Sequence, residues 1–226
     1  MSSTRTTAIV AGVFFIAAAV SAVAALFLYG PVLNHVDFVV SSSGADDSSI
    51  FAGALCELIL AASCIGTAVT LFPVVKRQNE AIALGYVAGR TVEAIVILVG
   101  AISLLAVVTL RQHPPSGTTA EALIAVARSL VAIHDWTFLI GPGFAIGVNT
   151  SLLAYLMYAS RLVPRLIPIV GLIGGPLIFA SSAAILFGLY PQVSTPGGLA
   201  AIPVTLWEMS LAIWMIVRGF RERAAS

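Results

Sequence analysis

Arg90 and Glu93 lie three residues apart near the middle of a long apolar segment. A charged side chain at the centre of a bilayer costs about 2.5 to 3.5 kcal/mol on insertion scales, so such residues usually have a partner or a function. Side chains three residues apart are neighbours on a helix, and pairing lowers the cost of both charges. The spacing therefore predicts an ion pair on one helix, which either belongs to a functional site or fixes the register of that helix.

Two more carboxylates, Glu57 and Glu208, fall at membrane depth in other segments. Like Glu93, each shares a helical face with small residues, which mark close helix contacts in membranes. The three glutamates are therefore expected to face the bundle interior, in one shared polar cavity, where they outnumber the single interior arginine. Unless Arg128 or a bound cation also enters, at least one glutamate is expected to be protonated at neutral pH, because desolvation and a like charge both disfavour the ionised form.

The segment 120–135 has the pattern of an amphipathic helix. Glu121, Arg128 and Asp135 recur at seven-residue steps and so share one helical face, while His134 lies on the apolar side. Such a helix could lie in the outer membrane interface. Alternatively, it could run straight into the following span as one long helix that bends at Gly141, Pro142 and Gly143. Both arrangements are compatible with the pattern.

These observations select seven residues as candidates for a binding site or polar cluster: Glu57, Arg90, Glu93, Arg128, His134, Asp135 and Glu208. Excess glutamates beside an arginine at the midplane are typical of proton or cation relays, so one hypothesis is a transport or binding site for an ion or small molecule. A second is an intramembrane metal-dependent hydrolase, in which Glu57, Glu93, His134 and Glu208 hold the metal. A third is a structural or regulatory membrane protein in which the cluster only organises the bundle.

Enzymatic motifs give little support to the hydrolase. The sequence contains no P-loop, no HExxH and no GxSxG, and no residue is assigned a catalytic role or a cofactor. Adjacent His134 and Asp135 point about 100° apart on a helix, which favours a packed histidine and an interfacial cap over a metal pair. Cys56 and Cys64 lie about 12 Å apart along one helix, too far for a disulfide. The sequence therefore does not favour an enzyme.

The composition identifies the class of protein that positions these residues. Of the 226 residues, 59% are hydrophobic and only 9% charged, and the mean hydropathy is +1.05. Six stretches approach or exceed the roughly 20 residues that cross a bilayer as a helix. The predicted spans are residues 8–29, 50–75, 82–110, 137–158, 167–189 and 200–218. We therefore expect one all-α transmembrane domain over residues 1–226, embedded in a lipid bilayer, with no charge pattern that suggests nucleic acid. The oligomeric state is left open.

The distribution of basic residues predicts the orientation. They cluster before the first span and after the second, fourth and sixth, as Arg5, Lys76, Arg77, Arg161, Arg165, Arg218, Arg221 and Arg223. Because cytoplasmic loops are enriched in Lys and Arg, both termini are expected to face the cytoplasm. The first span also has features of a cleavable signal peptide, whose removal would leave five spans. Its apolar run continues through Leu28, which is too long for a typical signal peptide and favours a retained span.

Several motifs resemble those of one family. They are the stretch 85–93, the triplet 134–136, the junction 160–165, the pair Trp207 and Glu208, and the pair Gly219 and Phe220. Together they resemble bacterial integral membrane proteins of the DUF4386 domain family, from the first span to Phe220. The resemblance implies a multi-pass protein of the bacterial inner membrane and no established activity. Glu57, Arg90 and Glu93 look like the polar positions of that family.

Overall fold

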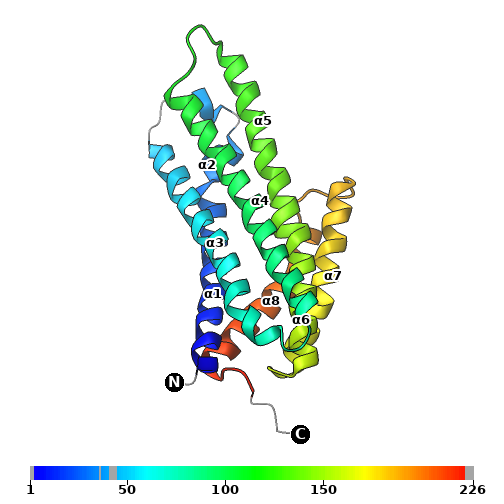
Figure 1. The fold of residues 1–226 in the computed structure, drawn as a ribbon. Helices are drawn as coiled ribbons and strands as arrows, with labels where there is room; N and C mark the ends of the chain where they lie inside the picture. Colours follow the sequence, from blue (N-terminus) through cyan, green and yellow to red (C-terminus); the bar gives the residue numbers. More distant parts are fainter. Residues whose placement is uncertain (1–2, 36, 41–44, 222–226) are drawn as a thin grey trace.

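The fold is all-helical in the computed structural model, which describes residues 3–35, 37–40 and 45–221 (Figure 1). Its elements are α1 (Ser3–Leu28), α2 (Gly30–Asn34), η1 (Phe38–Val40), α3 (Ala45–Val75), α4 (Glu80–Gln112), α5 (Ala120–Phe138), η2 (Leu139–Ala145), α6 (Ile146–Ser160), α7 (Leu166–Leu186) and α8 (Thr195–Val217). Within these ranges, 6 helical segments are long and apolar enough to cross a membrane. The predicted all-α fold with six spans is therefore confirmed.

The fourth span is one long helical segment, Ala120–Ser160, made of α5, η2 and α6. Residues 120–138 therefore continue into the span, which is the second of the two arrangements left open by the sequence. The Thr119 side chain accepts a hydrogen bond from the Ala122 amide and caps the start of α5. Pro142 lies in η2, whose wider π-type turns accommodate a residue that cannot donate a backbone hydrogen bond. Figure 1 shows α4 and α5 side by side and extending well beyond α7.

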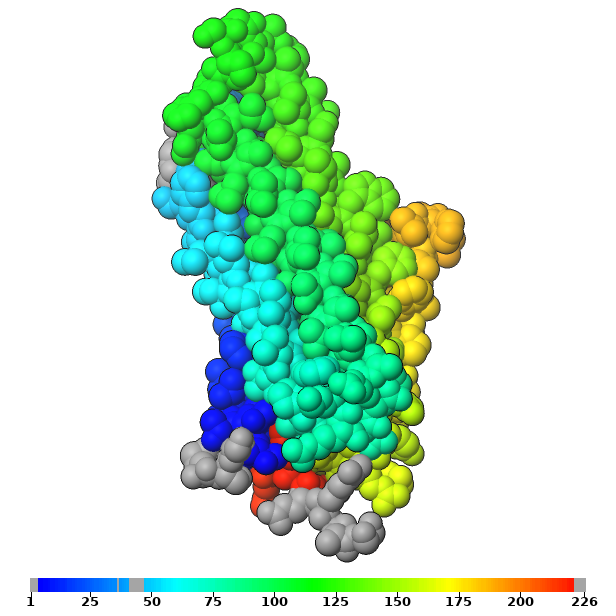
Figure 2. Space-filling model, viewed as in Figure 1, coloured from blue at the N-terminus to red at the C-terminus, as the bar shows by residue number. Residues whose placement is uncertain are grey.

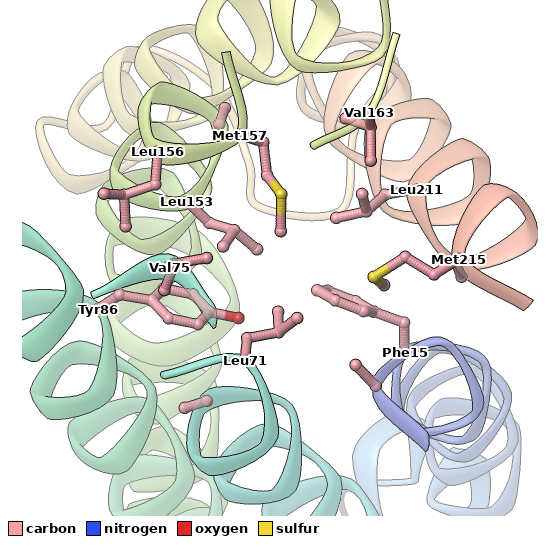
Figure 3. Packing of buried hydrophobic residues seen from close by; sticks show 14 of the residues in the cluster. Phe15, Leu71, Val75, Tyr86, Leu153, Leu156, Met157, Val163, Leu211 and Met215 are labelled. Atoms are coloured by element: carbon pink, nitrogen blue, oxygen red, sulfur yellow. The ribbon is translucent and has the colours of Figure 1, made fainter. Parts of the chain in front are cut away.

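The six long segments form a closed ring. In order of contact, α1 packs on α3, α3 on α4, α4 on α6, α6 on α7, α7 on α8, and α8 back on α1. Figure 3 shows side chains from five of these helices converging on the middle of the ring, among them Phe15, Leu71, Tyr86, Leu153 and Met215. Where these side chains meet, the ring therefore encloses a packed apolar core and not an open pore.

The start of α1 and the end of α8 lie at the same end of the bundle (Figure 1). The Arg5 guanidinium donates hydrogen bonds to the carbonyl oxygens of Met215, Ile216 and Val217, at 3.0, 2.6 and 3.2 Å. These carbonyls belong to the last turn of α8, where carbonyl groups run out of partners within the helix, so Arg5 caps α8 and joins it to α1. Arg223, one of the basic residues used to predict orientation, lies outside the described residues.

Candidate functional site

The local ion pair on α4 is the centre of the buried polar residues. Arg90 Nη1 lies 3.0 Å from Glu93 Oε2, and both side chains are almost completely buried. The Arg90 guanidinium also lies over the Phe15 ring of α1, with 5.8 Å between the guanidinium carbon and the ring centroid. A cation over an aromatic face gains a modest attraction that increases with desolvation. Arg90 therefore has one partner on its own helix, Glu93, and one on α1, Phe15.

Other helices supply further polar partners to this pair. Asn149 of α6 donates a hydrogen bond from Nδ2 to Glu93 Oε2 at 2.8 Å, and Thr67 of α3 lies 3.5 Å from Arg90 Nη2 through its hydroxyl oxygen. Glu208 of α8 lies 4.0 Å from Arg90 Nη1, measured from Oε1. We call Thr67, Arg90, Glu93, Asn149 and Glu208 the central cluster. It links α3, α4, α6 and α8.

Gly89 lets α6 approach the central cluster closely. A Cβ atom placed on Gly89 would overlap Oδ1 of Asn149, whereas one on Gly85 would meet only Leu152 Cδ1, at 3.7 Å. Small residues at such positions allow membrane helices to pack at short distance. Of the two glycines in this GxxxG spacing, only Gly89 is required for Asn149 to reach Glu93.

A small cavity adjoins the central cluster. Its volume is about 10 Å³, and its walls include Phe15, Arg90, Asn149 and Glu208. This is close to the minimum needed for one water molecule. Among the residues that the structure describes, Arg90 Nε and Asn149 Oδ1 are buried without a hydrogen-bond partner. A donor, an acceptor and a carboxylate thus surround a space the size of one small polar molecule.

A second group of buried polar residues lies toward the other end of the bundle. The Tyr29 hydroxyl donates a hydrogen bond to Glu57 Oε2 at 2.9 Å, and His134 Nε2 lies 3.9 Å from Glu57 Oε1. The rings of Tyr29 and His134 meet edge to face, with centroids 5.5 Å apart. We call Tyr29, Glu57 and His134 the outer cluster. Its members come from the turn between α1 and α2, from α3 and from α5.

Glycines also make room for the outer cluster. A Cβ atom on Gly53 would lie 2.7 Å from Cε1 of the Tyr29 ring, and one on Gly100 would lie 3.4 Å from Cδ2 of His134. The small residues on the faces of Glu57 and Glu93 therefore do mark close contacts. The groups they contact are side chains: the Tyr29 ring at Gly53, the Asn149 carboxamide at Gly89, and Thr137 and His134 at Gly100.

The two clusters are separate sites. His134 packs beside Gly100, which follows Glu93 on α4 by seven residues, or about 10 Å along the helix axis. On α3, Thr67 of the central cluster follows Glu57 by ten residues, or about 15 Å. The expected single cavity is therefore not formed, because residues on one helical face can still lie two or three turns apart along the axis.

Arg128 and Asp135 do not contact the buried glutamates of either cluster. Both are exposed and line an outer pocket of about 160 Å³, together with residues of α2, η1 and α4 such as Val32, Phe38 and Val107. Asp135 Oδ1 lies 3.7 Å from His134 Nδ1, but its side chain is 62% exposed. Arg128 therefore does not supply the missing positive charge beside Glu93 and Glu208.

The four proposed metal ligands do not converge. Glu57 and His134 belong to the outer cluster, whereas Glu93 and Glu208 belong to the central cluster. Across residues 3–35, 37–40 and 45–221, no three His, Cys, Asp or Glu side chains lie together in a metal-binding arrangement. The geometry required for the metal-dependent hydrolase is therefore not present among these residues.

Three cluster members were not selected by the sequence reasoning: Thr67, Asn149 and Tyr29. Threonine is common at helix contacts in membranes, so the residue type of Thr67 alone does not indicate a site. Asn149 is a lone carboxamide in an apolar span, which is itself an expensive group at membrane depth and could have been noted. Tyr29 ends the first apolar run, where tyrosine is also common as an interfacial residue, so its type alone does not indicate a buried contact.

The chain was compared with protein families, curated proteins and solved structures. A family model described as a domain of unknown function, DUF4386, matches residues 10–219. The comparison with curated proteins gave no match, and the comparison with solved structures gave none either. The match covers α1 from Val10 onward, the other long helices and both clusters.

Proposed function

We propose, from the premise that this chain belongs to the DUF4386 family, that the central cluster is a proton-binding site of a transporter-like membrane protein. Glu208 is the group that takes up the proton. The protein resides in the bacterial inner membrane with both termini in the cytoplasm, as the distribution of its basic residues favours. The family description names no activity, so the proposal rests on the geometry of the buried charges.

The unequal placement of two carboxylates around one arginine carries this proposal. Glu93 lies 3.0 Å from Arg90 and also accepts a hydrogen bond from Asn149 at 2.8 Å. Glu208 lies 4.0 Å from Arg90, and its side chain is 18% exposed. One guanidinium neutralises one carboxylate, and the more tightly held Glu93 takes that role. Glu208 is left as the surplus charge, which one proton neutralises.

Proton uptake at Glu208 would change how α8 meets α4. The ionised carboxylate is attracted to Arg90 across the water-sized cavity, whereas the neutral acid is not. Among the long helices, α8 packs closely on α1 and α7, and its Glu208 lies 4.0 Å from Arg90 of α4. The charge of Glu208 therefore acts on a contact between α8 and α4 across the ring, which is the kind of coupling that a proton-driven transporter needs.

Infrared difference spectroscopy tests the protonation step directly. Spectra of the protein in lipid nanodiscs are recorded between acidic and alkaline pH, for the wild type, Glu208→Gln and Glu121→Gln. The titrating band of a buried carboxylic acid is expected in the wild type and in Glu121→Gln, whose side chain is exposed on α5. It is expected to disappear in Glu208→Gln. A band that persists unchanged in Glu208→Gln would refute the assignment.

Flux measurements test the transport step. Proteoliposomes with an internal pH indicator are given an inward proton gradient, and uptake is compared between the wild type, Glu208→Gln and Glu93→Gln. Uptake is expected to fall most in Glu208→Gln. Equal uptake in all three proteins would remove the transport proposal. Because a monovalent cation would balance the same surplus charge, the assay is repeated in sodium and in potassium, and a dependence on one of them would replace the proton by that cation.

The alternative of a purely structural cluster has its own supporting contact. The hydrogen bond between Asn149 and Glu93 joins α6 to α4 at a buried position. If this is the whole role of the cluster, the Glu208→Gln variant should retain both its uptake and its thermal stability, because Glu208 does not take part in that bond.

A further inference from the structure

A large cavity lies at the end of the bundle that holds the start of α1 and the end of α8. Its volume is about 630 Å³, and four arginines line it: Arg5, Arg77, Arg218 and Arg221. The hydroxyl-bearing residues Thr4 and Ser160 also line it, and none of the lining residues is acidic. Figure 2 shows the end of the molecule where this cavity lies, with α1 and residues near the end of α8 close together. The charges that the described residues place around this cavity are therefore all positive.

Four segments that are distant in the sequence build this cavity. They are the start of α1, the turn after α3, the link after α6 and the segment after α8. The Arg221 amide donates a hydrogen bond to the Leu162 carbonyl at 2.8 Å, which holds the last segment against the link. Gly219 has a φ of 74°, and a Cβ atom on it would lie 3.1 Å from Arg5 Nη1. The chain can therefore turn here and lie against Arg5 because this residue is glycine.

The four arginines differ in the interactions they already make within the protein. Arg5 is bonded to the carbonyls at the end of α8, and Arg221 lies over the Trp214 ring, 5.6 Å from its centroid. Arg77 and Arg218 are exposed. Within the described part of the chain, neither Arg77, Arg218 nor Arg221 forms an ion pair with a carboxylate. Three guanidinium groups thus face a cavity without a negative partner there.

We propose that this cavity binds a phosphate-bearing anion. Planar guanidinium groups bind phosphate oxygens in pairs of hydrogen bonds, and arginine is more weakly hydrated than lysine, so it gives up water readily for such a ligand. The cavity lies at the helix ends, the level of the lipid headgroups, where basic pockets between membrane helices bind anionic lipids. Its volume is in the range of small-molecule sites and exceeds what one phosphate ion fills. This inference is independent of the proton-binding proposal.

The matched variants remove equal charge from the same end of the bundle. Arg77→Gln with Arg218→Gln removes two cavity arginines. The control, Arg161→Gln with Arg165→Gln, removes two arginines from the neighbouring link after α6 that do not line the cavity. Both variants change the basic residues that orient the protein by the same number, so a general effect of charge affects both. Size-exclusion chromatography establishes that each variant remains monodisperse.

The experiment measures lipid retention by native mass spectrometry. Protein is released from nanodiscs that contain equal amounts of phosphatidylglycerol and phosphatidylcholine. The wild type and the control variant are expected to retain phosphatidylglycerol preferentially, and the cavity variant to lose that preference by about tenfold or more, because each lost bond to a charged group is worth at least a factor of ten. Equal loss of the preference in both variants would overturn the proposal. Equal retention of the two lipids by the wild type would exclude phosphatidylglycerol as the ligand and leave the decision to inorganic phosphate.

A second arm distinguishes the two sources of phosphate. Inorganic phosphate is titrated into the detergent-solubilised wild type by isothermal calorimetry, and into the nanodisc sample before release. If phosphate binds and displaces phosphatidylglycerol, the site recognises the phosphate group alone. If only the lipid is retained, the site also requires the glycerol or acyl part. Both results support an anion site at the arginines, whereas binding of neither probe refutes it.

Discussion

The central and outer clusters bury similar groups but stabilise them differently. In the central cluster, Glu93 is paired with Arg90, which is always charged, at 3.0 Å. In the outer cluster, Glu57 receives a neutral hydrogen bond from Tyr29 at 2.9 Å, and its nearest basic group is His134 at 3.9 Å. A permanent cation must always be balanced, whereas a tyrosine and a histidine can both be neutral. The loss of one partner is therefore expected to cost more free energy of unfolding in the central cluster than in the outer cluster.

The two clusters also differ in the helices that surround them. The central cluster joins four members of the closed ring, whereas the outer cluster joins the turn after α1 with α3 and with the part of the fourth span that extends beyond α7. A change in the central cluster therefore affects the ring as a whole. A change in the outer cluster is confined to fewer contacts. Three substitutions test this difference, from the largest expected effect to the smallest.

Removal of the central cation should have the largest effect. In Arg90→Leu, the buried Glu93 and Glu208 lose the one cation that the described residues place near them, and we expect a loss of about 3 to 5 kcal/mol in the free energy of unfolding. His134→Leu in the outer cluster should cost clearly less. The measurement is reversible unfolding in mixed detergent micelles, followed by circular dichroism. Adding Glu93→Leu to Arg90→Leu should recover part of the loss. Equal costs for Arg90→Leu and His134→Leu would contradict the comparison.

The glycine pair on α4 tests the close approach of α6 to the central cluster. In Gly89→Ala the new methyl group overlaps Asn149, so either α6 moves or the hydrogen bond to Glu93 is lost, at a cost of about 1 to 3 kcal/mol. In Gly85→Ala the nearest atom is 3.7 Å away, and the variant should be as stable as the wild type. Thermal melting in detergent compares the stability of the two variants. A larger loss of stability in Gly85→Ala than in Gly89→Ala would show that Gly85, and not Gly89, is the glycine required for the approach of α6.

Removal of the hydrogen bond between Tyr29 and Glu57 in the outer cluster should have the smallest effect on stability. Tyr29→Phe removes the donor to Glu57 and leaves the ring packed against Gly53 and His134, so we expect a loss of about 1 kcal/mol. Tyr155→Phe, at an exposed position of α6, is the matched control and should change stability by less than about 0.5 kcal/mol. The same melting assay measures both. A loss in Tyr29→Phe as large as that in Arg90→Leu would reverse the order of the two clusters.

The sequence was sufficient for the features that depend on composition and on neighbouring residues of one helix. The low charge content and the six long apolar stretches predict a six-span helical membrane protein, since a bilayer accepts only helices or closed barrels. The pairing of Arg90 with Glu93 also follows from helix geometry alone, because residues three apart are always neighbours on a helix. The family match agrees with the motifs noted in the chain.

Partners on different helices were decided by the tertiary structure. Periodicity shows which way Glu57 and Glu208 point on their own helices, but it does not show which neighbour lies opposite or at what depth. The order of helices in the ring brings Asn149 to Glu93, and the length of α5 brings His134 to Glu57. One predicted site thus became two, because contacts between helices depend on their order, rotation and axial shift, none of which is contained in the periodicity of a single segment.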